Sequence, residues 1–439
     1  MLTVKKNIQS EVIMSTMEEL VPETSLFRKI DKYIDFTFIY EEVETLYCLD
    51  NGRPSLDPVV LFKLVFIQTL DGLKSMRKTC EKIKVDAEYR WFLNIPFGQD
   101  TPHFSTFSKN YERRFKDENI FETVFIRIVK QAMDHGLISG ETLYTDSTHK
   151  KANANKNKYG EMIEETVKKR KEWLEEEINE ERKKQGRKPF RYEDKIERKC
   201  IKVSTTDKGS GYYHRDNKEK GFMYVDHRTV DDKCNIIVDC HITKGNVHDS
   251  QPYCERIEAL KNKFGFEIKE VALDSGYDSL DIKKYLEDNG IFGVIGYRRY
   301  GTKESREYKR EFRYKRNEDY FIQEKTGEVI EYQGLIDRNG YKIYQNQEKD
   351  IILRRHIEEE RNERFKDNRL SERGKKLYKR RKETVERSFA DSKQNHGYRY
   401  AMVRGLEKNQ DYTWLICAAQ NMKNIALKLN KNNEITNHS

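Results

Sequence analysis

The order in which acidic residues follow predicted strands and helices is the feature that most constrains this fold. Residues 141–146 form a short predicted strand that ends on Asp146, and residues 267–274 form another that ends on Asp274. Residues 382–393 form an amphipathic helical segment that carries Glu386. The ends of neighbouring strands in a mixed sheet converge, and a helix packed on the sheet can add a third carboxylate. We therefore expect these three acids to meet in one site.

The chain between these segments completes a mixed sheet. Residues 222–230 and 236–242 alternate with a period of two around a turn at 231–235, which predicts an antiparallel hairpin. A helix over 279–289 and a strand over 292–297 follow the second acidic strand. The pattern predicts an α/β fold with a mixed five-stranded sheet flanked by helices.

The rest of the chain divides around that sheet. The sequence of residues 1–135 predicts short helices, one of which has Asp57 as its N-cap and Pro58 as its first helical residue. The polar and basic helix near 106–115 favours a helix-turn-helix-like DNA-binding domain, with a plain helical bundle as the alternative. We expect a catalytic core over 136–299, interrupted by a charged helical insertion at about 155–215. A polar insertion over 300–375 with strands near 320–322 and 341–344, a second core segment over 376–432 and a tail over 433–439 complete the chain.

Composition favours an anionic partner and a reducing compartment. The 439 residues carry a net charge of +9, and 36% of them are charged. Mean hydropathy is −0.95. This basic balance favours a polyanion. The seven cysteines contain no CxxC pair, which favours free thiols, and neither a signal peptide nor an apolar run of membrane-spanning length is evident. We expect a cytoplasmic protein with no membrane partner.

Three clustered carboxylates would repel one another unless a cation lay between them. An all-oxygen ligand set predicts Mg²⁺ or Mn²⁺, and two such ions can clamp the attacking and leaving oxygens of a phosphoryl transfer. Lys393 lies seven residues after Glu386 on the same helical face, where it would meet a phosphate. The alternatives are a solvated charge pair on that helix and two aspartates that only cap turns. Asp226 and Asp239 are interpreted as surface or turn acids, with an approach to the site as the alternative, and Asp249 as a helix N-cap.

Four motifs resemble the DDE transposases of bacterial insertion sequences. They lie at residues 144–148 (YTDST), 245–250 (GNVHDS), 272–277 (ALDSGY) and 381–393 (RKETVERSFADSK). The resemblance implies an RNase H-like catalytic core, an N-terminal helical DNA-binding region and an insertion before the helix with the glutamate. It implies that Asp146, Asp274 and Glu386 bind the metal ions. Unlike many relatives, the chain has no cysteine in residues 300–375.

The same resemblance implies DNA contacts near the glutamate. The family's Tyr-Arg-Glu-Lys signature falls on Tyr378, Arg381, Glu386 and Lys393. Arg381 is one residue further from the glutamate than usual and Lys382 has the usual spacing, so either can fill the arginine position. Arg387 and Arg399 are further candidate DNA contacts, because they are basic and close to Lys393.

The implied function is metal-dependent cleavage at the ends of a mobile element and strand transfer into target DNA. Its partners would be double-stranded DNA, as terminal inverted repeats and target, and further copies of the chain in a homodimer or larger assembly. The alternatives are an RNase H-like nuclease without strand transfer, a transposase-derived non-catalytic DNA-binding protein, and a basic structural or RNA-binding protein.

Overall fold

Helices make up the N-terminal region of the protein. The computed structural model describes residues 12, 14–48, 55–168, 170–214, 219–297 and 311–437. The helices here are α1 (Met17–Leu20), α2 (Leu26–Tyr33), α3 (Phe38–Val43), η1 (Glu44–Leu46), α4 (Pro58–Leu70), α5 (Met76–Ile83), α6 (Ala87–Leu93), α7 (Ser105–Asn110), η2 (Tyr111–Phe115) and α8 (Ile120–Asp134). The Asp57 carboxylate accepts the Val59 N–H at 2.7 Å and Pro58 opens α4, as predicted.

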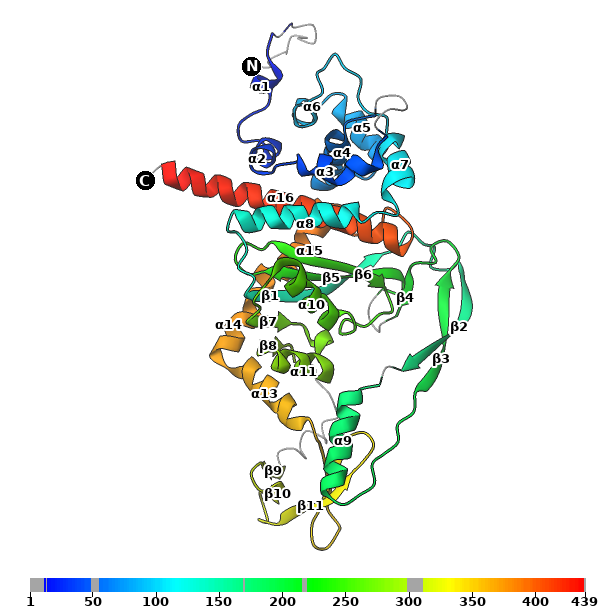
Figure 1. The fold of residues 1–439 in the computed structure, drawn as a ribbon, viewed down its shortest axis with the longest axis vertical. Helices are drawn as coiled ribbons and strands as arrows, with labels where there is room; N and C mark the ends of the chain where they lie inside the picture. The colour runs from blue at the N-terminus through cyan, green and yellow to red at the C-terminus, as the bar shows by residue number, and fades with distance from the viewer. Residues whose placement is uncertain are drawn as a thin grey trace, which may run out of the picture.

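A mixed sheet lies below these helices (Figure 1). Its strands are β1 (Thr142–Lys151), β4 (Gly211–Tyr213), β5 (Gly221–Asp231), β6 (Ile237–Lys244), β7 (Glu270–Leu273) and β8 (Phe292–Ile295). The order is β6–β5–β1–β7–β8, with β4 paired to the start of β5. β5 is antiparallel to β1 and β6, whereas β1, β7 and β8 are parallel. The predicted mixed α/β architecture is confirmed, and β4 is a sixth strand that the sequence did not predict.

Helices cover this sheet and connect it to the N-terminal region. They are α10 (Tyr253–Phe264), η3 (Ser275–Tyr277), α11 (Leu280–Asp288), α13 (Glu359–Leu370), α14 (Glu372–Arg380), η4 (Arg381–Glu383), α15 (Val385–Asn395) and α16 (Leu406–Asn437). α16 packs against α2, α4, α8 and β6. One continuous apolar core therefore includes Phe62 of α4, Val124 of α8, Leu143 of β1 and Ala418 of α16.

The insertion between β8 and α13 forms a second sheet. Its strands are β9 (Phe312–Lys315), β10 (Tyr320–Gln323), β11 (Val329–Ile336), β12 (Tyr341–Gln345) and β13 (Ile352–His356), in the order β13–β12–β11–β10–β9. It has a small core of its own around Ile330, Tyr344 and Leu353. The strands predicted near 320–322 and 341–344 are confirmed.

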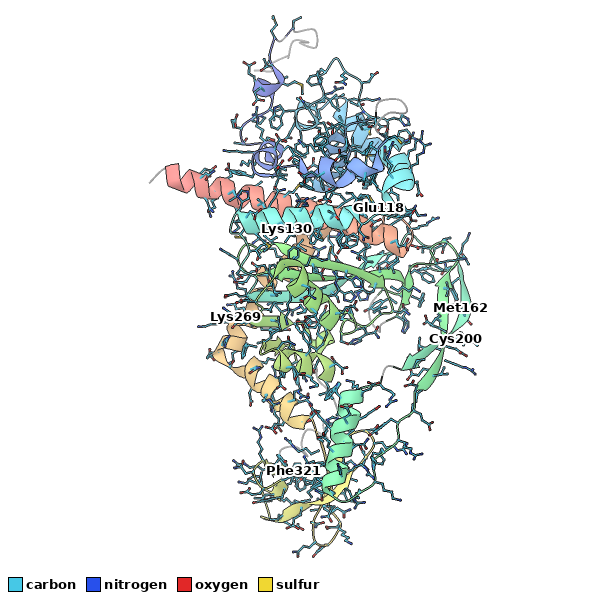
Figure 2. The ribbon with its side chains drawn as sticks, in the orientation of Figure 1. Glu118, Lys130, Met162, Cys200, Lys269 and Phe321 are labelled. Carbon is cyan, nitrogen blue, oxygen red and sulfur yellow. The ribbon has the colours of Figure 1, made fainter. Side chains whose placement is uncertain are left out.

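The charged insertion differs from the sequence prediction. We expected a charged helical insertion at about 155–215, but its first part is strand β2 (Tyr159–Lys168), which is followed by helix α9 (Glu172–Lys184). β2 pairs antiparallel with β3 (Lys195–Ser204) in a separate two-stranded ribbon. β-branched residues such as Ile163 and Val167 favour the strand. The ribbon runs along one side of the molecule, where Figure 2 labels Met162 and Cys200.

Among the helices described, none is long and apolar enough to cross a lipid bilayer.

Candidate active site

Asp146 and Asp274 lie side by side on the central sheet. β1 and β7 are parallel and pair Thr145 with Leu273, so the next residue of each strand is an aspartate at the same level. Asp274 directly follows β7, as expected. The prediction that the first strand ends at Asp146 is wrong, since β1 continues to Lys151 because it pairs with β5 along its whole second half.

Glu386 lies in the first turn of α15 and shares a partner, Arg381, with the two aspartates. The Arg381 guanidinium lies 2.8 Å from an Asp146 oxygen, 3.8 Å from Asp274 and 3.9 Å from Glu386. The Arg381 side chain is only 4% exposed, whereas those of Asp274 and Glu386 are nearly half exposed. The structure thus brings the three predicted acids around one buried cation.

The environment of Asp146 disfavours its charged form. The pKa of this carboxyl is raised to about 6, chiefly by burial and to a smaller extent by the nearby charges of Asp274 and Glu386. Arg381 and the Ser147 N–H, which donates to Asp146 at 2.8 Å, lower the pKa and offset part of the rise. The site therefore attracts a further positive charge.

Of the two candidates for the arginine position of the signature, Arg381 faces the three acids and Lys382 does not. α14 ends at Arg380, and the short helix η4 then turns Arg381 inwards, where it donates to the Tyr378 hydroxyl at 3.2 Å. Burial raises the pKa of Tyr378. Lys382 and Arg387 are both exposed, and within the described part of the chain neither forms an ion pair with the three acids.

Lys393 lies on the same side of the sheet as the acids. Its ammonium donates to the Thr148 hydroxyl, two residues beyond Asp146 on β1. Burial lowers the pKa of Lys393. Arg399 is exposed and donates to the Lys393 carbonyl at 3.3 Å. Lys393 therefore lies close to Asp146, and Arg399 lies close to Lys393.

The interpretation of Asp226 and Asp239 as surface or turn acids is wrong. Asp226 is fully buried on β5 and pairs with buried Arg228 at 2.7 Å. Arg228 also donates to the hydroxyls of Ser388 and Ser392 on α15 at 2.8 and 2.9 Å, and so fixes this helix on the sheet. Asp239, 5% exposed, pairs with Arg256. The sequence signal that could have indicated this burial is the pair Asp226 and Arg228, which lie two residues apart on β5 and therefore point to the same face of the sheet.

Asp249 does not cap a helix, because the cap of α10 is Pro252. Its carboxylate accepts the Ser147 hydroxyl at 2.7 Å and lies against Gly276, where an added Cβ would be 2.6 Å from a carboxylate oxygen. Asp249 thus contacts the segments that follow both site aspartates. It positions these segments, and the sequence alone did not assign it that role.

The donor chemistry fits a divalent cation. The three acids offer only carboxylate oxygens, the ligands that Mg²⁺ and Mn²⁺ prefer. Within the described residues no three His, Cys, Asp or Glu side chains are already spaced to hold a metal ion. The Arg381 guanidinium lies between the acids instead, so a bound metal would compete with it for the same oxygens.

A basic groove begins next to this site. It has a volume of about 1050 Å³ and separates the insertion sheet from β8, α11 and α13. Gly296 in its wall lies against the Tyr378 hydroxyl and Ser275, which adjoins Asp274. Cationic and aromatic side chains line it, among them Arg313, Arg316, Arg354, Lys366, Arg369, Tyr297, Tyr314 and Tyr341. Such a lining suits a nucleic acid strand.

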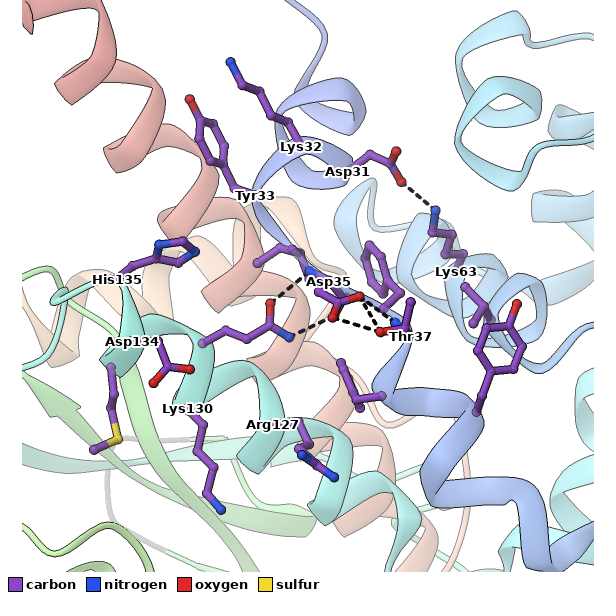
Figure 3. Close-up of a pocket in the computed structure, with 17 residues that line it drawn as sticks. Asp31, Lys32, Tyr33, Asp35, Thr37, Lys63, Arg127, Lys130, Asp134 and His135 are labelled. Atoms are coloured by element: carbon purple, nitrogen blue, oxygen red, sulfur yellow. Dashed lines mark hydrogen bonds and ion pairs between the residues drawn. The ribbon is translucent and has the colours of Figure 1, made fainter.

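A second hollow, of about 930 Å³, lies among α2, α3 and α8 and is not lined by the three acids (Figure 3). Its walls are held by Gln131 of α8, which bonds to the backbone N–H and carbonyl of Asp35 at 3.0 and 2.8 Å. An ion pair of 2.6 Å between Asp31 and Lys63 closes one side. These contacts connect the N-terminal helices to α8.

Two family models match the chain. Residues 15–113 match a transposase domain (DUF772) and residues 341–426 match a transposase DDE domain. The chain therefore contains one segment similar to a transposase domain and one similar to a transposase DDE domain. The second match contains Glu386 and Lys393 and agrees with the DDE transposase family that the sequence motifs indicated.

No curated protein matches the chain. Among solved structures, a piggyBac transposase in a synaptic complex with hairpin DNA is similar over 92% of this chain and 75% of that chain. The two sequences are 12% identical and the TM-score is 0.37.

Proposed function

We propose that this chain is a DNA transposase, which cleaves DNA at the ends of its element and joins the freed ends to target DNA, with Asp146, Asp274 and Glu386 holding two Mg²⁺ or Mn²⁺ ions. The convergence of the three carboxylates on Arg381 is the observation that carries the proposal. Asp146 and Asp274 lie outside both matched segments, so their assignment depends on this geometry. The strand order β6–β5–β1–β7–β8 supports an RNase H-like core.

The bound ions would activate the attacking oxygen and stabilise the leaving 3′ oxygen. The chain's own residues position the DNA around them. Lys393 and Arg399 lie where they can hold a backbone phosphate beside the acids. Tyr378 accepts a hydrogen bond from Arg381 and so orients its guanidinium. Arg228 and Asp249 hold α15 and the segments after the two aspartates in place.

The partners follow from the same surfaces. The basic groove and the exposed residues Lys382 and Arg387 would contact double-stranded DNA, both the terminal inverted repeats and the target. Two ends must be processed together, so we propose a homodimer or larger assembly in the DNA complex. The proposed compartment is the bacterial cytoplasm.

The test is cleavage and joining of DNA that carries the repeats flanking the gene, with Mg²⁺ or Mn²⁺ present. We expect Asp146→Asn, Asp274→Asn and Glu386→Gln each to lower both activities by at least about 100-fold, because each removes a charged ligand. Glu383→Gln is the matched control, since Glu383 is exposed one turn before Glu386. Full activity in any of the three variants would refute the site.

The same assay separates the alternatives. Cleavage without joined product would indicate a nuclease. Binding of repeat DNA without metal-dependent cleavage would indicate a transposase-derived DNA-binding protein. Neither alternative has an observation of its own in the structure that favours it over strand transfer.

A further inference from the structure

We propose that the two-stranded ribbon of β2 and β3 is the surface on which a second copy of this chain docks. In this dimer the ribbons pack face to face across a two-fold axis parallel to the strands. The inference deepens the proposed homodimer by naming its surface. It does not depend on the chemistry of the three acids.

The ribbon is a sheet of its own with two unpaired edges in the described structure. One end of the ribbon lies beside β4, where the rings of Tyr159 and Tyr212 lie 6.4 Å apart, and at this end Thr205 donates to the Lys158 carbonyl across the two strands. Figure 1 shows the two strands running away from β4 along one side of the molecule. An isolated pair of strands is only marginally stable in water, so a ribbon of ten-residue strands benefits from a covering surface.

One face of the ribbon is apolar at two levels. The register pairs Ile163 with Cys200 and Val167 with Ile196, and residues directly opposite each other point to the same side. Ile163, Val167 and Ile196 are 62–68% exposed, and Cys200 is exposed as well. Large aliphatic side chains this exposed on a regular strand favour a binding surface.

The charges of β2 and β3 favour a second copy of this chain over DNA as the partner of the ribbon. β2 carries three glutamates and one lysine, whereas β3 carries four Lys or Arg residues and one glutamate. The ribbon as a whole is therefore nearly neutral, which gives it little attraction for DNA. Its two strands have opposite net charges, however, so the surface can complement a second copy of itself.

Only one of the two face-to-face arrangements uses this complementarity. A two-fold axis parallel to the strands places β2 of each copy over β3 of the other. Glu165, which pairs with Arg198 at 2.7 Å within one ribbon, then also faces Arg198 of the second copy. Ile163 faces Cys200 of the second copy, and Val167 faces Ile196. An axis across the strands would instead place acidic β2 over acidic β2.

The size of the surface predicts a weak dimer. Ten residues of strand span about 34 Å, and two strands with their side chains are about 10 Å wide, so each copy would bury roughly 340 Å². The total of about 700 Å² is less than half of a standard stable interface. Copies already held on two DNA ends would associate more readily, because their effective concentration is higher.

Cysteine crosslinking of the full-length protein tests the arrangement. In the dimer the two Cys200 residues lie about 11 Å apart across the interface, which a short bis-maleimide can span. At about 50 µM protein we expect a crosslinked dimer that is lost in Cys200→Ser. Cys48→Ser is the matched control, because Cys48 is also exposed but lies in the N-terminal region; it should keep the dimer.

Two further sets of variants test the face and the charges by crosslinking and sedimentation. Ile163→Lys with Val167→Lys should reduce the crosslinked fraction at least fivefold, whereas Met162→Lys, on the opposite face of the ribbon, should not. Glu165→Arg should weaken the dimer, and adding Arg198→Glu should restore it.

The proposal would be overturned if the wild-type protein gave no crosslinked dimer, or if the crosslinked dimer persisted in Cys200→Ser. It would also be overturned if Met162→Lys and the double lysine variant had equal effects, or if the double lysine variant lost duplex DNA binding and kept the dimer. Asp274→Asn separates the two proposals, because it should remove cleavage and leave the crosslink unchanged.

Discussion

Arg381 is a buried cation that contacts all three site acids, and its removal tests the competition with metal directly. In Arg381→Gln the carboxylates lose an internal counter-charge, so their attraction for a divalent ion increases. We expect Mn²⁺ to bind about tenfold more tightly, a change of about 1.4 kcal/mol, as measured by calorimetric titration of the DNA-free protein. Arg380→Gln is the control, since Arg380 pairs with Asp232 and Glu383 instead. Unchanged or weaker Mn²⁺ binding in Arg381→Gln would contradict the competition.

Asp146 makes stability depend on pH. Its folded-state pKa is raised from 3.8 to about 6, so the folded protein binds more protons than the unfolded chain between these values. The cost of ionising Asp146 in the fold is therefore absent below pH 3.8 and fully present above about pH 6. A shift of this size corresponds to at most about 3 kcal/mol.

Asp146→Asn removes this ionisation, so it should stabilise the metal-free protein at pH 7.5 and have little effect at pH 4. Urea denaturation of variant and wild type at both pH values measures the difference. The same stabilisation at both pH values would show that folding does not raise the pKa of Asp146.

At the level of elements, the contact between β5 and α15 depends on a buried ion pair. Arg228 connects Asp226 to two serines of α15, and Ser392 in turn donates to Gln420 of α16 at 2.7 Å. Removing one partner leaves a buried charge without compensation. We expect Arg228→Ala to lower the free energy of unfolding by about 3–5 kcal/mol in chemical denaturation.

The exposed pair Lys284–Asp288 within α11 is the comparison for this prediction. Lys284→Ala should change stability by less than about 1 kcal/mol. If Arg228→Ala cost no more than this, β5 would not fix α15 through the ion pair.

The same elements show what the sequence could and could not predict. The strands around Asp146 and Asp274 were predictable, because their alternation and the residues that follow them are local features. The choice between Arg381 and Lys382 was not, because the short helix η4 changes the rotation of the chain between α14 and α15. The ribbon was mistaken for a helix because β2 depends on pairing with β3, more than 25 residues further along the chain. Asp226 was mistaken for a surface acid because α15 and α16, which cover β5, come much later.

At the scale of the whole molecule, the basic groove should contribute to DNA binding through phosphate contacts. Arg354 and Lys366 line the groove and are exposed. Each alanine substitution should weaken binding of repeat DNA and reduce the slope of log K against log salt by about 1. Fluorescence anisotropy over a salt series measures this slope. Lys325→Ala, in the turn after β10 and outside the groove lining, should leave it unchanged. An unaltered slope in both groove variants would show that the groove does not contact DNA phosphates.

The long helix α16 has a consequence for where the element may be cut. Its 32 residues span about 48 Å, and it packs against α2, α4 and α8 at the same time as β6 of the sheet that carries Asp146. We propose that α16 fixes the distance between DNA bound to the N-terminal helices and the phosphate that is cut at the three acids. Its length corresponds to about 14 base pairs of B-form DNA. Inserting five base pairs between the recognised repeat and the element tip would rotate the cut site by half a helical turn, out of reach of the carboxylates.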